Sequence, residues 1–341
     1  MSTGTEPPGG PAGPGGLGVR LPSPLLPAED ERFGRHGVRL LLKRDDLIHP
    51  ELIGNKWRKL APNLAGAAGR ALVTFGGAYS SHLRATAAAG RLLGLSVTGF
   101  VRGDELAGRP LNPSLARCAA DGMRLVFTDR ARYRAKDDPE VLAALLREAG
   151  VAPDAVLVPE GGSNARAVRG CAALGAELRG RADVVAVACG TGGTLAGLAA
   201  GLDPEQRALG IPVLRGGFLG GAIRALQEEA FGGVRGRWSL DERFHFGGYA
   251  RTTPELLEFA EDFGARHGMA VERLYVAKML YALLALTEEG AFPPGTALAA
   301  VITGTPGPEQ PPVTVPPATD KAAEAAKRIT PIEATKPTGR R

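Results

Sequence analysis

Three glycine-rich turns constrain the fold of this chain more than any other feature, because each one follows an apolar run and opens a helical segment. The turns are GGAYSSH (76–82) after ALVTF, EGGSN (160–164) after AVLVP, and GTGGT (190–194) after VVAVAC. Where parallel strands alternate with helices, binding sites form outside the carboxyl ends of the strands, in turns of this kind. The turns therefore indicate both a fold class and the place of a functional site.

The apolar runs predict parallel strands that are covered by helices on both faces. Several of these runs are apolar at every position, as expected for strands between two helical layers. The candidate strands are residues 38–43, 71–75, 96–102, 123–127, 155–159, 184–189 and 297–303. Segments such as HLRATAAAGRLLGL and GGTLAGLAAGL, which overlap or follow two of the turns, are typical of helices. We therefore predict an α/β fold.

Both ends of the chain differ in composition from its centre. Residues 1–18 are nearly all Gly, Pro and small side chains, and residues 306–341 are rich in Pro, Ala, Thr and Lys. Such segments bury too little apolar surface to offset the entropy of ordering. We interpret them as a disordered Gly/Pro-rich tail and a disordered Pro/Ala/Lys-rich tail around a folded body of residues 19–305.

The formal net charge of +5 leaves two explanations open, an affinity for nucleic acid or simply an Arg-rich composition. Basic residues are interspersed with acidic ones throughout, and only 5% of the residues are aromatic. A nucleic-acid-binding surface needs clustered cations, and binding of single strands also needs rings on which bases stack. We therefore expect no nucleic-acid partner.

The sequence also limits the compartment and the metal content that we expect. No run approaches the roughly 20 apolar residues of a membrane helix, and the opening residues lack the charged and apolar regions of a signal peptide. Cys118, Cys171 and Cys189 are an odd number without the spacing of zinc ligands. We expect a cytoplasmic protein with reduced cysteines, no membrane association and no metal.

The turn GTGGT is the best-defined candidate for an anion site. Gly190, Gly192 and Gly193 allow backbone N–H groups to converge on an anion at a helix N-terminus, and Thr191 and Thr194 add hydroxyl donors. The spacing matches neither GxGxxG nor GxxxxGK[ST], so a phosphate monoester fits better than a dinucleotide. The alternative is a glycine turn that only lets a helix and a strand approach each other.

The segment GNKWRKL (54–60) supplies a candidate nucleophile, Lys56, with Arg58 and Lys59 close to it. Nearby cations and partial burial lower the pKa of an amine, as a Schiff-base lysine requires. A basic run of this kind is otherwise usually a solvated helix face. The combination of such a lysine with a monophosphate site on one α/β body is what pyridoxal phosphate requires.

The motifs KRDDL, GNKWRKL, FGGAYSSH, PEGGSNA, CGTGGTLAG, FHFGGYARTTPELL, YVAKMLYALL and VITGT follow one another over residues 38–305. This succession resembles the 1-aminocyclopropane-1-carboxylate deaminase and D-cysteine desulfhydrase family of pyridoxal-phosphate enzymes. The resemblance implies a three-layer fold of the tryptophan synthase β-subunit type (fold type II), with two domains and mostly parallel sheets. It implies a large cofactor-binding domain of residues 19–60 plus 165–305, a small domain of residues 61–164, and a homodimer.

The resemblance also implies the roles of individual residues. Lys56 forms the Schiff base with the cofactor and later moves the proton at the substrate α-carbon. The remaining residues are Gly190, Thr191, Gly192, Gly193 and Thr194 at the cofactor phosphate, Asn55, Ser81 and Thr303 elsewhere around the cofactor, Ser80, Ser81 and His82 at the substrate carboxylate, and Ser80, Tyr249 and Tyr275 as catalytic side chains.

Four positions either depart from the family pattern or distinguish deaminases from desulfhydrases within it. Ser81 stands where the family has an amide that hydrogen-bonds the cofactor, and Val276 stands where deaminases have an acidic residue that pairs with the pyridinium nitrogen. Thr303 is typical of desulfhydrases, whereas deaminases have Leu there. Thr305 replaces a glycine, with an effect that the sequence does not reveal.

Together these features favour β-elimination from D-cysteine, which gives pyruvate, ammonia and sulfide. The substrate is a small amino acid. The alternatives are ring opening of 1-aminocyclopropane-1-carboxylate, and a protein that binds pyridoxal phosphate with little catalysis. A third hypothesis, from a different class, is a basic protein that associates with nucleic acid through its tails.

Overall fold

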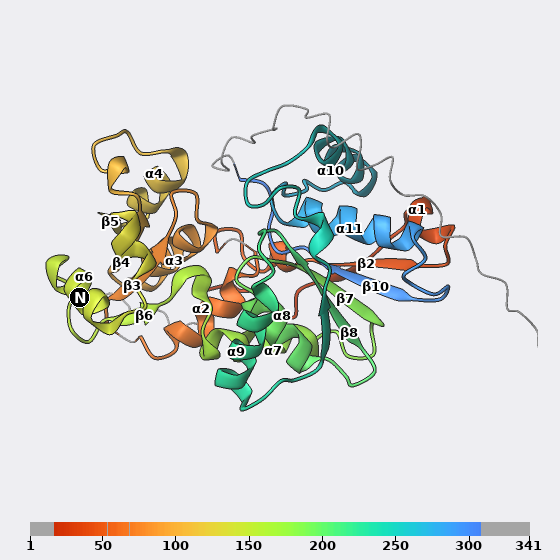
Figure 1. Cartoon of the computed structure of the whole chain (residues 1–341), viewed down its shortest axis with the longest axis horizontal. Helices are drawn as coiled ribbons and strands as arrows, with labels where there is room; N and C mark the ends of the chain where they lie inside the picture. Colours follow the sequence, from red (N-terminus) through yellow and green to blue (C-terminus); the bar gives the residue numbers. More distant parts are fainter. Residues whose placement is uncertain (1–16, 53, 68, 308–341) are drawn as a thin grey trace, which may run out of the picture.

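The computed structural model describes residues 17–52, 54–67 and 69–307, which form two separate sheets with helices around them (Figure 1). Nearly all of both predicted tails lies outside the described residues. The strands are β1 (Leu25–Ala28), β2 (Arg39–Lys43), β3 (Leu72–Gly76), β4 (Val97–Arg102), β5 (Met123–Thr128), β6 (Val156–Val158), β7 (Val184–Cys189), β8 (Arg207–Pro212), β9 (Arg237–Leu240) and β10 (Ala297–Val301). The helices are α1 (Glu31–Gly34), α2 (Lys56–Leu64), α3 (Ser81–Leu93), α4 (Pro113–Ala120), α5 (Arg130–Arg134), α6 (Pro139–Glu148), α7 (Ala165–Ala176), α8 (Gly193–Gly201), α9 (Leu219–Phe231), α10 (Pro254–His267) and α11 (Val276–Glu288).

The two sheets are mostly parallel. The larger has six strands in the order β1-β2-β10-β7-β8-β9, and the smaller has four in the order β5-β4-β3-β6. In the described chain, β1 and β2 are the one antiparallel pair of neighbours. The predicted α/β class with mostly parallel sheets is therefore confirmed, and each of the seven predicted strands is present with ends that differ by at most two residues. Strands β1, β8 and β9 were not predicted.

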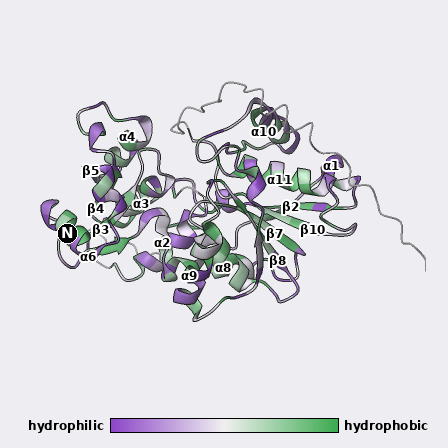
Figure 2. Cartoon of the chain, viewed as in Figure 1, coloured by the Kyte–Doolittle hydropathy of each residue, from purple (hydrophilic) through white to green (hydrophobic). Residues whose placement is uncertain are grey.

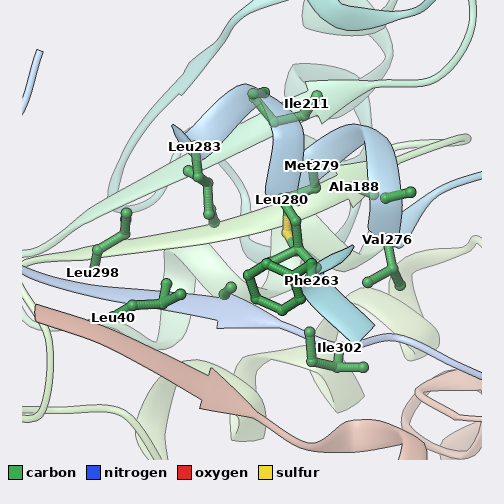
Figure 3. Packing of buried hydrophobic residues seen from close by; sticks show 14 of the residues in the cluster. Leu40, Ala188, Ile211, Phe263, Val276, Met279, Leu280, Leu283, Leu298 and Ile302 are labelled. Carbon is green, nitrogen blue, oxygen red and sulfur yellow. The ribbon is translucent and has the colours of Figure 1, made fainter. Parts of the chain in front are cut away.

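Helices cover both faces of the larger sheet, which gives three layers. Alternate residues of β7 point to opposite faces. Residues 184, 186 and 188 pack with α10 and α11, whereas residues 185, 187 and 189 pack with α7, α8 and α9. Figure 3 shows Leu280 and Leu283 of α11 directed toward the strands. The full burial of β7 explains why its sequence is apolar at every position.

The smaller sheet is also covered on both faces. Residues of α2, α3 and α4 pack on one face, and Tyr133 of α5 and Leu145 of α6 pack on the other. On that second face, the rings of Phe75 and Phe100 stack with their centroids 5.0 Å apart. All strands of this sheet come from residues 61–164, and the strands of the larger sheet come from the rest of the chain. The exact domain bounds remain a prediction.

Several helices begin at a capping residue that is followed by proline. Asn112, Asp138 and Thr253 each accept a backbone N–H from the first turn of α4, α6 and α10, and proline occupies the next position. Proline is tolerated there because the first helical N–H has no intrahelical partner. These local signals therefore set the starts of the three helices.

Apolar residues concentrate in the strands of the larger sheet and in α8, as Figure 2 shows. Cys118, Cys171 and Cys189 are buried thiols outside any disulfide. Within the described residues, no group of three or more His, Cys, Asp or Glu side chains could hold a metal ion. No helix in that same part of the chain is long and apolar enough to cross a membrane.

Candidate active site

The turn at residues 190–194 connects the carboxyl end of β7 to α8. Gly192 has a φ of +82° and precedes the first residue of α8, and no side chain caps this helix. A Cβ atom on Gly192 would lie 2.6 Å from Ile223 Cγ1, so glycine is required for both conformation and space. The first N–H groups of α8 are therefore left without a side-chain partner and are suited to bind an anion.

A cation and two hydroxyls accompany this helix end. The Lys59 ammonium donates to Ser163 Oγ at 3.0 Å and to Gly161 O at 3.1 Å. Ser163 Oγ in turn lies 2.6 Å from Thr191 Oγ1. The Lys59 nitrogen is 3.5 Å from where a Cβ on Gly193 would stand, so the cation lies at the turn itself.

The charge of Lys59 is not neutralised by an ion pair in the described part of the chain. Burial lowers the pKa of this ammonium, because a buried cation has lost its hydration. A doubly charged phosphate would restore a partner to the ammonium and accept hydrogen bonds from the N–H groups of α8. The residues present therefore fit the phosphate of pyridoxal phosphate.

Lys56 is the first residue of α2, and the residues before it connect it to the phosphate site. Asn55 Nδ2 donates to Thr194 Oγ1 at 3.2 Å, and Asn55 N donates to Thr303 O at 3.1 Å. Gly54 has a φ of +57°, and a Cβ there would lie 1.8 Å from Thr303 O. The close approach of the two segments explains the glycine in GNK and brings Thr303 next to Lys56.

The environment of Lys56 favours a neutral amine. Burial and the nearby Lys59 lower its pKa to about 8, whereas Glu272 opposes this shift. The amine is the nucleophilic form that attacks an aldehyde. Lys56 is half-buried, and its nitrogen is 3.4 Å from Asn55 Oδ1. These properties fit a lysine that attaches a cofactor carbonyl.

A buried ion-pair network anchors the helix that carries Lys56. The Arg58 guanidinium donates to Asp45 at 2.8 Å and to Glu177 at 2.9 Å. These carboxylates raise the pKa of Arg58 above its ordinary value, against the cost of burial. Arg44 pairs with Asp46 at 2.7 Å. Asp45 and Asp46 therefore have a structural, charge-pairing role.

Tyr275 and Tyr249 form an aromatic pair beside the phosphate turn. The Tyr275 hydroxyl lies 3.3 Å from where a Cβ on Gly190 would stand, and the two rings meet edge to face with centroids 6.1 Å apart. Burial, together with Tyr249 and Glu272, holds the pKa of Tyr275 well above its usual value. Burial also raises the pKa of Tyr249. Both hydroxyls therefore stay protonated at neutral pH.

Ser80, Ser81 and His82 lie where β3 leads into α3, but they differ in burial. Ser80 caps α3 and accepts the N–H of Leu83 at 3.3 Å, and Ser81 begins the helix half-buried. His82 is only 2% exposed, and its Nε2 lies 2.7 Å from Thr74 Oγ1. The two serines are therefore partly exposed, whereas His82 is enclosed.

The enclosure of His82 determines its charge. Burial and the cations Lys59 and Lys56 lower its pKa to about 3, so the ring is neutral at physiological pH. Its Nδ1 has no hydrogen-bond partner among the described residues. A neutral, buried ring cannot supply a cation to a substrate carboxylate, so the N-terminus of α3 would have to do so.

Three residues of this region were not predicted to bind the cofactor or to hold a catalytic side chain. Lys59 and Ser163 contact the phosphate turn, and the Glu272 carboxylate accepts the N–H groups of Leu274, Tyr275 and Val276 at 2.7–3.1 Å. The turn EGGSN was a signal for Ser163, because it is one of the three glycine-rich turns that follow a strand. Glu272 fixes the backbone of Tyr275 and carried no such signal.

Comparison with known proteins agrees with this geometry. Residues 18–304 match the family described as pyridoxal-phosphate dependent enzymes. The chain belongs to this family. The predicted cofactor and the predicted class of enzyme are therefore confirmed.

Two relatives of this pyridoxal-phosphate dependent enzyme show which activities are named for proteins of similar sequence. A Pyrococcus furiosus protein, named provisionally as a 1-aminocyclopropane-1-carboxylate deaminase, is 31% identical over 281 residues, which cover 74% of this chain and 81% of the relative. A mitochondrial Arabidopsis thaliana protein, named a bifunctional D-cysteine desulfhydrase and 1-aminocyclopropane-1-carboxylate deaminase, is 30% identical over 73% of this chain and 67% of its own length. The predicted resemblance is confirmed.

Solved structures confirm the predicted fold. The crystal structure of an ACC deaminase homologue superposes with a TM-score of 0.71 and 26% identity, over 84% of this chain and 90% of the other. The threonine deaminase isoform 2 of Solanum lycopersicum has a TM-score of 0.60 at 16% identity, over 85% of each chain. The second likeness concerns the fold alone.

Proposed function

We propose that the protein eliminates hydrogen sulfide from D-cysteine and releases pyruvate and ammonia. The observation that carries this proposal is the pair Tyr249 and Tyr275, whose hydroxyls stay protonated and of which the Tyr275 hydroxyl lies at the phosphate turn. The sulfur that leaves the β-carbon gains negative charge, and a phenol that stays protonated at this place can donate a hydrogen bond to it. Thr303 next to Lys56 supports the same choice through the family resemblance.

The chain's own residues divide the work of binding. When bound, pyridoxal phosphate supplies an electron sink for the carbanion at the substrate α-carbon. Residues 190–194, Lys59 and Ser163 would hold its phosphate, and Lys56 would hold its carbonyl carbon, with Asn55, Ser81 and Thr303 around it. The N-terminus of α3, with Ser80 and Ser81, would receive the substrate carboxylate, because helix N-termini attract anions.

Lys56 and the tyrosine pair divide the chemical steps. Lys56 Nζ accepts the α-proton of the substrate, since burial lowers its pKa to about 8 and so raises the share of neutral amine at neutral pH. The C–S bond electrons leave with sulfur as hydrosulfide, to which the tyrosine pair donates a hydrogen bond and which takes its second proton from water. Water then converts the remaining three-carbon enamine to pyruvate and ammonia. We further propose that the protein is cytoplasmic and forms a homodimer. The family resemblance supports the dimer.

Ring opening of 1-aminocyclopropane-1-carboxylate is the second candidate, because both relatives described above carry that activity in their names. That reaction breaks a C–C bond, so it demands a stronger electron sink than the loss of a thiolate. Val276 is fully buried at the position where deaminases have an acidic partner for the ring nitrogen. The apolar residue therefore favours elimination over ring opening.

The test is an absorbance spectrum of the purified protein with added pyridoxal phosphate, followed by product assays with D-cysteine, L-cysteine and 1-aminocyclopropane-1-carboxylate. A near-visible band with equal amounts of pyruvate and sulfide from D-cysteine is the expected result. 2-Oxobutanoate from the cyclopropane substrate would establish the second candidate instead. A band without any product would identify a binder with little catalysis, and the lack of a band would refute the assignment of Lys56.

A further inference from the structure

The segment that carries Tyr249 has an unusual backbone. Phe246 and Ala250, with φ of +53° and +58°, are the two non-glycine residues with positive φ in the described chain. Gly247 and Gly248 between them also have positive φ. Left-handed conformations are costly for residues with a Cβ, and they persist only where surrounding contacts hold them. Contacts from neighbouring residues must therefore hold the segment 245–250 in this conformation.

Lys278 of α11 makes these contacts. Its side chain is completely buried, and its ammonium donates to His245 O and to Gly248 O, both at 2.9 Å. The two carbonyls lie on either side of Phe246 and Gly247, so one side chain closes the turn immediately before Tyr249. A buried ammonium is expensive unless it is hydrogen-bonded, so a mainly apolar packing role would be met more cheaply by methionine or leucine.

The same helix also carries the partner of Tyr249. Tyr275 immediately precedes α11, and Lys278 is three residues further along. Glu272 holds the backbone N–H of Tyr275 at 2.7 Å, while Lys278 holds the carbonyls before Tyr249. A carboxylate thus fixes one tyrosine and an ammonium fixes the other, and the rings meet with centroids 6.1 Å apart.

We propose that Lys278 is a positioning residue that holds residues 245–250 so that Tyr249 lies against Tyr275 at the phosphate turn. The effect on turnover rests on the proposed function, whereas the effect on the loop does not. Lys278 does not touch the substrate. It acts through the backbone of the turn.

The first measurement is hydrogen–deuterium exchange of the cofactor-free full chain, comparing wild type with Lys278→Met. Exchange of residues 245–251 is expected to accelerate at least about tenfold, since the turn loses both carbonyl contacts. Gln227→Met is the matched control, because Gln227 is also completely buried and donates to two carbonyls, Ala196 O at 2.9 Å and Arg235 O at 2.8 Å. It should accelerate exchange near residue 235 and leave 245–251 unchanged.

The second measurement uses the enzyme loaded with pyridoxal phosphate. Lys278→Met should reduce kcat/KM for D-cysteine about tenfold, through KM or kcat, while the affinity for the cofactor stays within about twofold of wild type. If D-cysteine is not the substrate, the amino-acid concentration that gives half of the spectral change of the bound cofactor replaces KM. Ala250→Gly added to Lys278→Met should recover part of the loss, since glycine adopts positive φ without strain.

Two results would overturn the proposal. Unchanged exchange at 245–251 in Lys278→Met would show that the lysine does not hold the turn. Faster exchange with unchanged amino-acid affinity and turnover would show that the turn does not place Tyr249. Should Lys278→Met fail to fold, Lys278→Gln is measured instead, and wild-type exchange together with a lowered kcat/KM in that variant would also refute the role, because the turn would be held while turnover was lost. A wild type that turns over no amino acid refutes the proposed function, yet the exchange data still decide on Lys278.

Discussion

The cofactor side and the substrate side of the site are held in different ways. On the cofactor side, hydrogen bonds from Lys59 and Ser163 join α2, the turn at 160–164 and the start of α8. On the substrate side, Tyr249 stands on a turn with left-handed residues, and 41% of its surface is exposed. Three converging segments thus form the cofactor side, whereas contacts from one helix, α11, hold the Tyr249 turn on the substrate side.

Because the two sides are held by different contacts, cofactor binding and turnover can be altered separately. A change among the contacts of Lys59 disturbs several segments that all face the phosphate. A change near Tyr249 disturbs a turn that can move without altering those segments. Mutations on the two sides should therefore give different combinations of cofactor affinity and catalytic rate, and the following predictions test this.

The largest effect is expected at Lys56, where the two sides meet. Lys56→Ala should abolish the near-visible band and lower elimination by about 10³-fold or more, since one amine serves for attachment and for proton transfer. Noncovalent cofactor binding, measured by quenching of tryptophan fluorescence, should persist because the phosphate contacts remain. A variant that keeps the band would contradict the assignment.

Lys59→Met should act on the cofactor side alone. Loss of one charge-assisted hydrogen bond weakens binding by about 1.5–3 kcal/mol, so the Kd for pyridoxal phosphate should rise about 10- to 100-fold. At saturating cofactor, KM for the amino acid should stay near the wild-type value. Equilibrium dialysis and initial rates measure the two quantities. A change in KM for the amino acid with an unchanged Kd for the cofactor would contradict the assignment of Lys59 to the cofactor side.

Tyr249→Phe should act on the substrate side alone. Removal of a neutral hydroxyl costs about 0.5–1.5 kcal/mol of interaction, which corresponds to a fall of about 2- to 10-fold in kcat/KM. Cofactor affinity should not change. Phe244→Leu, in the same region but with no hydroxyl to lose, is a control for packing. Equal effects of both variants would show that the Tyr249 hydroxyl has no part in turnover.

The smallest expected effect concerns pH. Because Lys56 attacks only as the neutral amine and its pKa is lowered to about 8, the rate of cofactor attachment should rise with pH and level off above about pH 8. Lys59→Met removes a repelling cation, so the Lys56 pKa should rise and the plateau should move to higher pH. His82, with a pKa of about 3, should add no step near neutrality. Stopped-flow absorbance at several pH values measures the profile.

Much of the fold was predictable because buried parallel strands are apolar at every position. The three missed strands lack that signal. Strand β8 contains Gly210 and ends at Pro212, although glycine weakens a strand. A Cβ on Gly210 would lie 2.4 Å from Leu195 Cδ2, so the glycine lets α8 approach the sheet. Strands β1 and β9 have four residues each and lie at the sheet edges.

The candidate site was predictable where short motifs define it. The turns around Lys56 and Gly190 carry their function in the local sequence. Lys278 holds the turn before Tyr249 through hydrogen bonds to backbone carbonyls about 30 positions away. Any amino acid could supply such a carbonyl. No side-chain pattern therefore announces it. The contact between Lys59 and Ser163 joins two side chains 104 positions apart, so no local motif contains both residues.

The burial of the three cysteines has a practical consequence for work with this enzyme. Burial raises the pKa of Cys171 and raises that of Cys189 to about 12, so their reactive thiolate forms are scarce, and Cys118 is fully enclosed. Electrophiles and oxidants attack thiolates at accessible sites. A maleimide or haloacetamide should therefore leave the folded chain unmodified, so that its incorporation at these cysteines reports opening of the fold.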